Sequence, residues 1–167
     1  MNQAHIHLLF NHFPIIGSII AVLVLIAGML LKNQTVRFVA YGLFVFAVLT
    51  TIPTFLTGEG AEEIVEEFPG VSHDLIHEHE ESAEAALWLM VISGLMACIV
   101  FYLEQIQNQL APKIRIALLA IALANVLFMA RAGNSGGQIR HPELSGNPVA
   151  AQSDSASGES HEAQEHE

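Results

Sequence analysis

Four long and nearly uninterrupted apolar segments dominate this sequence. They cover residues 14–31, 38–56, 85–103 and 114–130. Each comes close to the roughly 20 residues that a helix needs to cross a hydrocarbon core of about 30 Å. Charged residues make up only 14% of the chain, whereas an ordinary soluble domain is about 25% charged. A soluble all-helical protein would be left with too little polar surface. The sequence therefore predicts an all-α integral membrane protein, a four-helix up-down bundle.

The charges of the loops predict how the bundle is oriented. Lys32 and Arg37 flank the first short loop, and Lys113 and Arg115 lie at the third. The positive-inside rule makes that end cytoplasmic. The opposite end receives both termini and the long second loop, where residues 58–82 hold nine acidic residues and no Lys or Arg. We expect a multi-pass protein of a bacterial inner membrane with both termini extracytoplasmic.

The sequence also predicts the state of two segments outside the spans. In residues 60–68 the apolar side chains share one helical face and glutamates lie opposite, which predicts a short interfacial helix between spans two and three. Residues 148–167 are rich in Ser, Ala, Gly, Glu and Gln, a composition typical of a disordered tail. The four-helix transmembrane domain is accordingly expected at residues 1–147, followed by this acidic tail.

All nine histidines are expected at the extracytoplasmic end. Two of them, His161 and His166, lie in the acidic tail, where solvation is the expected state. The other seven come from the entry to span one, the start of the third long helix and the exit of span four: His5, His7, His12, His73, His77, His79 and His141. Neutral imidazole binds haem iron and transition-metal ions. Ionisable residues near membrane depth are usually functional. A shared ligand site is therefore predicted.

The sequence predicts which side of the third long helix faces the bundle, but it leaves the structure of the first histidine segment open. His79 lies nearly opposite His73 and His77, on a stripe that continues through small residues such as Ala86. We expect that stripe to face the bundle, so that His79 points inward and the other two meet water. Pro14 leaves two structures open for the first segment, because proline disfavours helix at the preceding residue. A helix either begins there or continues outward through a kink.

Four short motifs occur in a fixed order along the chain. They are Asn11-His12-Phe13-Pro14-Ile15 at span one, Thr57-Gly58-Glu59 after span two, His79-Glu80-Glu81 before span three and Gly136-Gly137 after span four. Together they resemble an uncharacterised bacterial family of four-span predicted integral membrane proteins with a His-Phe-Pro signature at span one. The likeness covers about residues 1–143.

That family is a domain of unknown function with no established activity, and some members look linked to cytochrome c-like modules. The resemblance therefore implies the four-span fold and points towards electron transfer. It places His12, His79 and His141 at motif positions, and His7 is expected to occupy one as well. His73 and His77 do not obviously belong to the pattern.

The leading hypothesis is a membrane b-type haem-binding electron-transfer protein or a subunit of a respiratory complex. Four-helix bundles hold haem between facing helices through two axial histidines, and His12 with His79 is the preferred pair. His7 and His141 form a second pair or lie around the first. Arg131 and Arg140 are candidate cofactor-binding residues, because arginine pairs with haem propionates; simple snorkelling to the interface is equally expected.

Two other function classes stay open. A divalent transition-metal site for Zn, Cu or Fe, in a binding or sensing protein, would use His7, His12, His79 and His141 as metal ligands. A structural subunit of a membrane complex would use the spans for docking, with cytochrome c-like or respiratory subunits as partners. Its oligomeric state is not predicted.

Several other functions are disfavoured. The six Lys and Arg are scattered and form no basic stripe for nucleic acid. The chain contains no His-Glu-x-x-His or P-loop motif, so no catalytic residue is predicted and the chain is not expected to be an enzyme on its own. The four apolar segments hold no Asp, Glu or Lys, which disfavours a proton relay across the bilayer.

Overall fold

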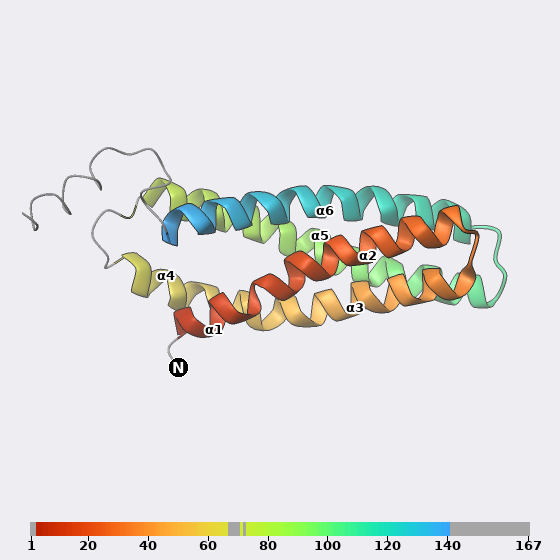
Figure 1. Cartoon of the computed structure of the whole chain (residues 1–167), viewed down its shortest axis with the longest axis horizontal. Coiled ribbons are helices and arrows are strands. Elements are labelled where there is room, and N and C mark those ends of the chain that lie inside the picture. The colour runs from red at the N-terminus through yellow and green to blue at the C-terminus, as the bar shows by residue number, and fades with distance from the viewer. Residues whose placement is uncertain (1–2, 67–70, 72, 141–167) are drawn as a thin grey trace, which may run out of the picture.

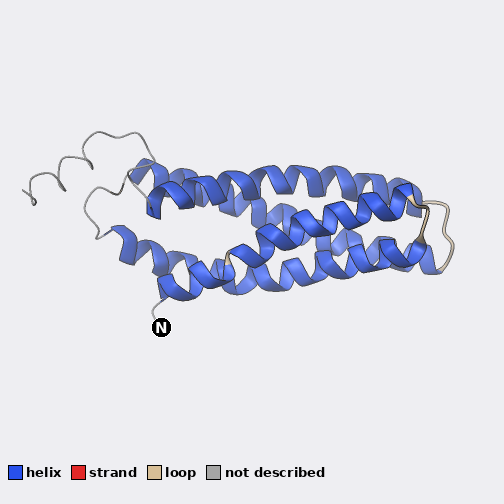
Figure 2. Cartoon of the chain, in the orientation of Figure 1, coloured by secondary structure: helices blue, strands red, loops and turns tan. Residues whose placement is uncertain are grey.

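The described part of this protein is entirely helical. A computed structural model describes residues 3–66, 71 and 73–140, and these contain α-helices and no strand (Figure 2). The helices are α1 (Gln3–Phe10), α2 (His12–Leu30), α3 (Gln34–Leu56), α4 (Gly58–Glu66), α5 (His73–Gln105) and α6 (Ala111–Arg140). The all-α prediction is confirmed. His141 and the predicted tail at 148–167 lie outside the described residues.

Four helical segments are long and apolar enough to cross a membrane. They are His5–Leu30, Gln34–Glu66, His73–Gln105 and Ala111–Ile139. Each extends beyond the apolar run that predicted it, and α5 begins at His73, well before the apolar run at residue 85. A helix at α4, between spans two and three, is also as expected. His7, His12 and His79 consequently lie on helices and not on loops.

The helices pack side by side with their connections at the two ends. α5 packs along α6 and α2 along α3, and the two pairs meet through α3 with α5 and α2 with α6. In Figure 1 the α2–α3 and α5–α6 loops lie at one end of the molecule. α1, α4, the start of α5 and the end of α6 lie at the other end (Figure 1). Here α1 packs mainly against α4 and α3.

The first segment continues outward as a helix. Only Asn11 separates α1 from α2, and its backbone is still helical with φ −61° and ψ −24°. Pro14 has no N–H, so it cannot donate the usual helical hydrogen bond to Phe10. The lost bond accounts for the break just before the proline. Of the two structures that the sequence left open, the chain adopts the one that continues outward, with a break at Asn11.

Side-chain size separates the inside of the bundle from its outside. Small residues such as Ala21, Ala40 and Ala97 are fully buried, which lets the helices approach closely. Large apolar side chains point outward, and Leu95 and Leu127 are 61% and 68% exposed. A continuous apolar surface of this kind is unfavourable in water. The surface therefore supports a multi-pass membrane protein.

Gly28 should tolerate no side chain, because α3 begins against it. A Cβ at this position would lie 2.8 Å from the backbone nitrogen of Arg37. We expect Gly28→Ala to lower the free energy of unfolding by about 2 kcal/mol, the usual cost of overpacking. Gly42→Ala is the control, since a Cβ there meets nothing within 4 Å. Thermal unfolding in detergent measures both, and equal midpoints for the two variants would contradict the close α2–α3 contact.

Candidate histidine site

His7 of α1 and His79 of α5 lie next to each other, edge to face, at the end where α1 and α4 lie. Their ring centroids are 6.5 Å apart and the ring planes meet at 76°. Both side chains are half-buried. The two rings come from segments far apart in the sequence, and each is held by a neighbouring helix.

α3 holds the His7 ring. Its Nδ1 lies 2.9 Å from the carbonyl oxygen of Thr54 and 3.5 Å from the hydroxyl of Thr57. Carbonyls in the last turn of a helix lack intrahelical partners, and α3 ends at Leu56. Because a carbonyl oxygen only accepts hydrogen bonds, Nδ1 is the donor. A neutral His7 therefore has its proton on Nδ1 and a free lone pair on Nε2.

α6 holds the His79 ring in the same way. Nδ1 of His79 lies 2.8 Å from the carbonyl oxygen of Ala132, with the Ser135 hydroxyl 3.4 Å away. Nδ1 again donates, so Nε2 again carries the lone pair. Gly136 makes this approach possible, because a Cβ there would lie 3.0 Å from Cε1 of His79. Glycine at this position thus lets α6 lie directly against the imidazole.

His79 points inward as predicted, and its two neighbours on α5 do not. The side chains of His73 and His77 are 82% and 73% exposed. His77 lies 3.7 Å from both Glu80 and Glu81, which are exposed as well. The helical stripe of small residues was therefore a sound guide to this face.

The structure places His7, and not His12, against His79. His12 is exposed at the start of α2, on the side that also presents Phe13 and Ile16. Its Nδ1 lies 3.2 Å from the Leu8 carbonyl of the preceding turn. The difference arises because α1 turns its His7 face towards α3 and α4, a packing that the sequence pattern does not specify.

The remaining predicted site residues lie apart from this pair or outside the residues that the structure describes. Arg131 is exposed on α6. Arg140 ends α6 and its side chain is not described, and His141 lies beyond it. Within residues 3–66, 71 and 73–140, no three His, Cys, Asp or Glu side chains are placed to hold one metal ion. The site that the structure describes is a pair of histidines.

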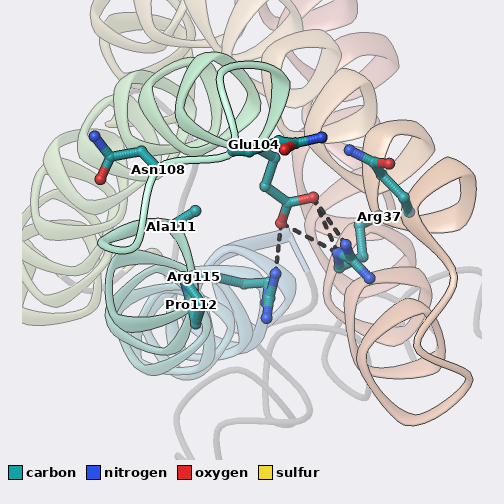
Figure 3. Close-up of a pocket in the computed structure, with 8 residues that line it drawn as sticks. Arg37, Glu104, Asn108, Ala111, Pro112 and Arg115 are labelled. Carbon is teal, nitrogen blue, oxygen red and sulfur yellow. Dashed lines mark hydrogen bonds and ion pairs between the residues drawn. The ribbon is translucent and has the colours of Figure 1, made fainter.

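A buried carboxylate at the opposite end was missed from the sequence. Glu104, only 7% exposed, accepts hydrogen bonds from Nε and Nη2 of Arg37 and from Nη1 of Arg115 (Figure 3). It also accepts one from the Tyr41 hydroxyl at 2.8 Å. The expectation that the spans hold no buried acid depended on ending the third at residue 103. α5 continues through Gln105. The available signal was that Glu104 is the only acidic residue in residues 85–142.

Comparisons with protein-family models, with curated proteins and with solved structures find no match to this chain. The family resemblance described above therefore stays a prediction.

Proposed function

We propose that this chain is a b-type haem protein of electron transfer, with His7 and His79 as the two axial ligands. One observation carries the proposal. Both rings have Nδ1 bound to a backbone carbonyl, which leaves the lone pair of each Nε2 available to a metal. Histidines that bind metals almost always donate their second ring N–H to a carbonyl, a carboxylate or water. The paired arrangement is that of a ligand site.

The separation of the rings supports the same reading. A metal–imidazole bond is about 2 Å long, and the centre of the ring lies about 1 Å behind the nitrogen. Two imidazoles on opposite sides of one metal ion therefore have centroids about 6 Å apart. The 6.5 Å between His7 and His79 agrees with this spacing.

A pair suits haem better than it suits a bare ion. The porphyrin supplies four of the ligands of its iron, so the protein needs to add only two. A zinc ion takes four ligands, at least three of them from protein. The metal-ion alternative therefore needs further ligands beside His7 and His79, and His141 is the candidate closest in sequence to the end of α6. When bound, haem supplies one-electron exchange.

The charges of the bundle support an extracytoplasmic site in an antiparallel four-span protein. Four of the six Lys and Arg flank the two loops at the end away from the histidines. By the positive-inside rule that end is cytoplasmic. The opposite end carries the acidic residues of α4 and of the first turns of α5. A soluble, cytochrome c-like partner with a basic face would be attracted to this end.

One optical spectrum tests the proposal. The full chain, purified in detergent from cells that make haem, should show a Soret band that shifts on reduction. Elemental analysis should give iron in proportion to haem. A stoichiometric zinc or copper ion without a Soret band would overturn haem in favour of the metal-ion alternative. A protein free of both would leave the histidines as structural residues.

Adding a side chain at Gly136 should displace the His79 ring. Gly136→Val puts a branched side chain where even a Cβ would lie 3.0 Å from the ring. We expect haem affinity to fall about tenfold, as when the groups that orient a metal ligand are disturbed. Gly137→Val is the matched control, because a Cβ there meets nothing within 4 Å. Haem titration of both apoproteins measures the effect, and equal affinities would speak against a role for the His79 contact.

A further inference from the structure

A cavity of about 320 Å³ opens beside Glu104, at the end of the bundle opposite the histidines. Its lining comes from the start of α3, the end of α5, the α5–α6 loop and the start of α6 (Figure 3). The lining residues are Gln34, Arg37, Glu104, Gln107, Asn108, Ala111, Pro112 and Arg115. Apart from the three charged residues, the polar side chains of the lining are the neutral amides of Gln34, Gln107 and Asn108.

The lining carries one positive charge in excess. Arg37 and Arg115 are both cationic, and Glu104 is the only acid that lines the cavity. The carboxylate is already engaged, since Oε1 accepts from Arg37, Arg115 and Tyr41, and Oε2 accepts from Arg37. One charge on Glu104 cannot neutralise two guanidinium groups. An anion in the cavity would neutralise the remaining positive charge.

The arginines also have donor capacity that the protein does not use. Arg115 reaches Glu104 through Nη1, and its buried Nε has no hydrogen-bond partner among the described residues. The side chains of Arg37 and Arg115 remain 14% and 18% exposed and both line the cavity. An anion in the cavity would therefore accept from the exposed part of these two guanidinium groups and not from the enclosed Nε.

We propose that this cavity binds a phosphate group. Tetrahedral phosphate oxygens accept several hydrogen bonds at once and pair well with guanidinium. The neutral amides add donors without adding charge. Lys32 and Lys113 are close in sequence to the lining residues Gln34 and Pro112. At this end of the chain phospholipid headgroups would meet the protein, and basic residues there attract anionic lipid. The phosphate belongs either to an anionic phospholipid or to free inorganic phosphate.

The test changes the cavity without touching the Arg37–Glu104–Arg115 cluster. Gln34→Glu adds a negative charge to the lining, while Thr35→Glu adds the same charge at an exposed neighbour that does not line it. Both positions lie in the first turn of α3, where acidic residues are well tolerated. Both variants should therefore fold, which circular dichroism and gel filtration check.

Two measurements distinguish the sources of the phosphate. Calorimetric titration of the detergent-solubilised full chain with inorganic phosphate measures the free anion. Native mass spectrometry after release from nanodiscs of equimolar phosphatidylglycerol and phosphatidylcholine measures retained lipid. We expect binding in at least one experiment, weakened about tenfold by Gln34→Glu through charge repulsion and unchanged by Thr35→Glu. No binding of either ligand to the wild type, or equal weakening by the two variants, would overturn the proposal.

Discussion

Replacing His79 by alanine should abolish stable haem binding. The proposed site has two protein ligands, and removing one leaves the iron with a single axial histidine and a gap where the imidazole packed against α6. We expect the purified variant to retain at most about a tenth of the wild-type haem, because axial ligation is what holds a non-covalent haem in a bundle. Absorbance at the Soret band relative to protein measures this directly.

His77→Ala is the matched control for that variant. It makes the same substitution on the same helix, but the His77 side chain is 73% exposed and lies 3.7 Å from the exposed Glu80 and Glu81. Its haem content should equal that of the wild type. Equal haem in both variants would remove His79 from the site.

A second comparison separates the pair seen in the structure from the pair preferred on sequence. His7→Ala should lose haem as His79→Ala does, because the two rings lie next to each other, with centroids 6.5 Å apart. His12→Ala should keep it, because His12 is exposed and its ring contacts the Leu8 carbonyl one turn before it. The reverse result would restore His12 as the ligand.

The spans and the inward face of α5 were predictable because they depend on local pattern. An apolar run of nearly 20 residues has few alternatives to a membrane helix. The stripe that carries His79 repeats with helical period, so its small residues indicate the packed side. Neither inference needs to know which helix lies opposite.

The partner of His79 was not predictable, because it depends on tertiary packing. His7 and His12 are both near the start of span one, and the pattern gives no reason to prefer either. The choice follows from the break at Asn11 and from α1 packing against α3 and α4. The carbonyl of Thr54 that orients His7 lies at the end of another helix. Such contacts join residues distant in sequence.

Glu104 shows a different limit of the sequence pattern. A hydropathy run ends where the first charged residue appears, which placed this glutamate outside the span. Its burial depends on two arginines that come from α3 and α6. A charged residue enters a helix-packed interior only when paired in this way. A lone acid at the basic end of a membrane protein was therefore the sign of an ion-pair cluster.

Replacing Glu104 by alanine should give the largest loss of stability of any single substitution considered. Arg37 and Arg115 would then lie close together and mostly buried, without the carboxylate that neutralises them. Breaking a buried ion pair from one side usually costs about 3–5 kcal/mol. For a chain of this size, we expect the thermal midpoint in detergent to fall by about 10 °C.

The control and the double variant identify the cause of that loss. Glu84→Ala makes the same change on α5 at an exposed position and should shift the midpoint by little. Adding Arg37→Leu to Glu104→Ala removes one of the stranded charges, so the double variant should be more stable than Glu104→Ala alone, a non-additivity expected of residues in contact. Strict additivity of the two substitutions would mean that α5 loses packing at Glu104 and not charge balance, and the cluster would then be a contact between helices without an electrostatic role.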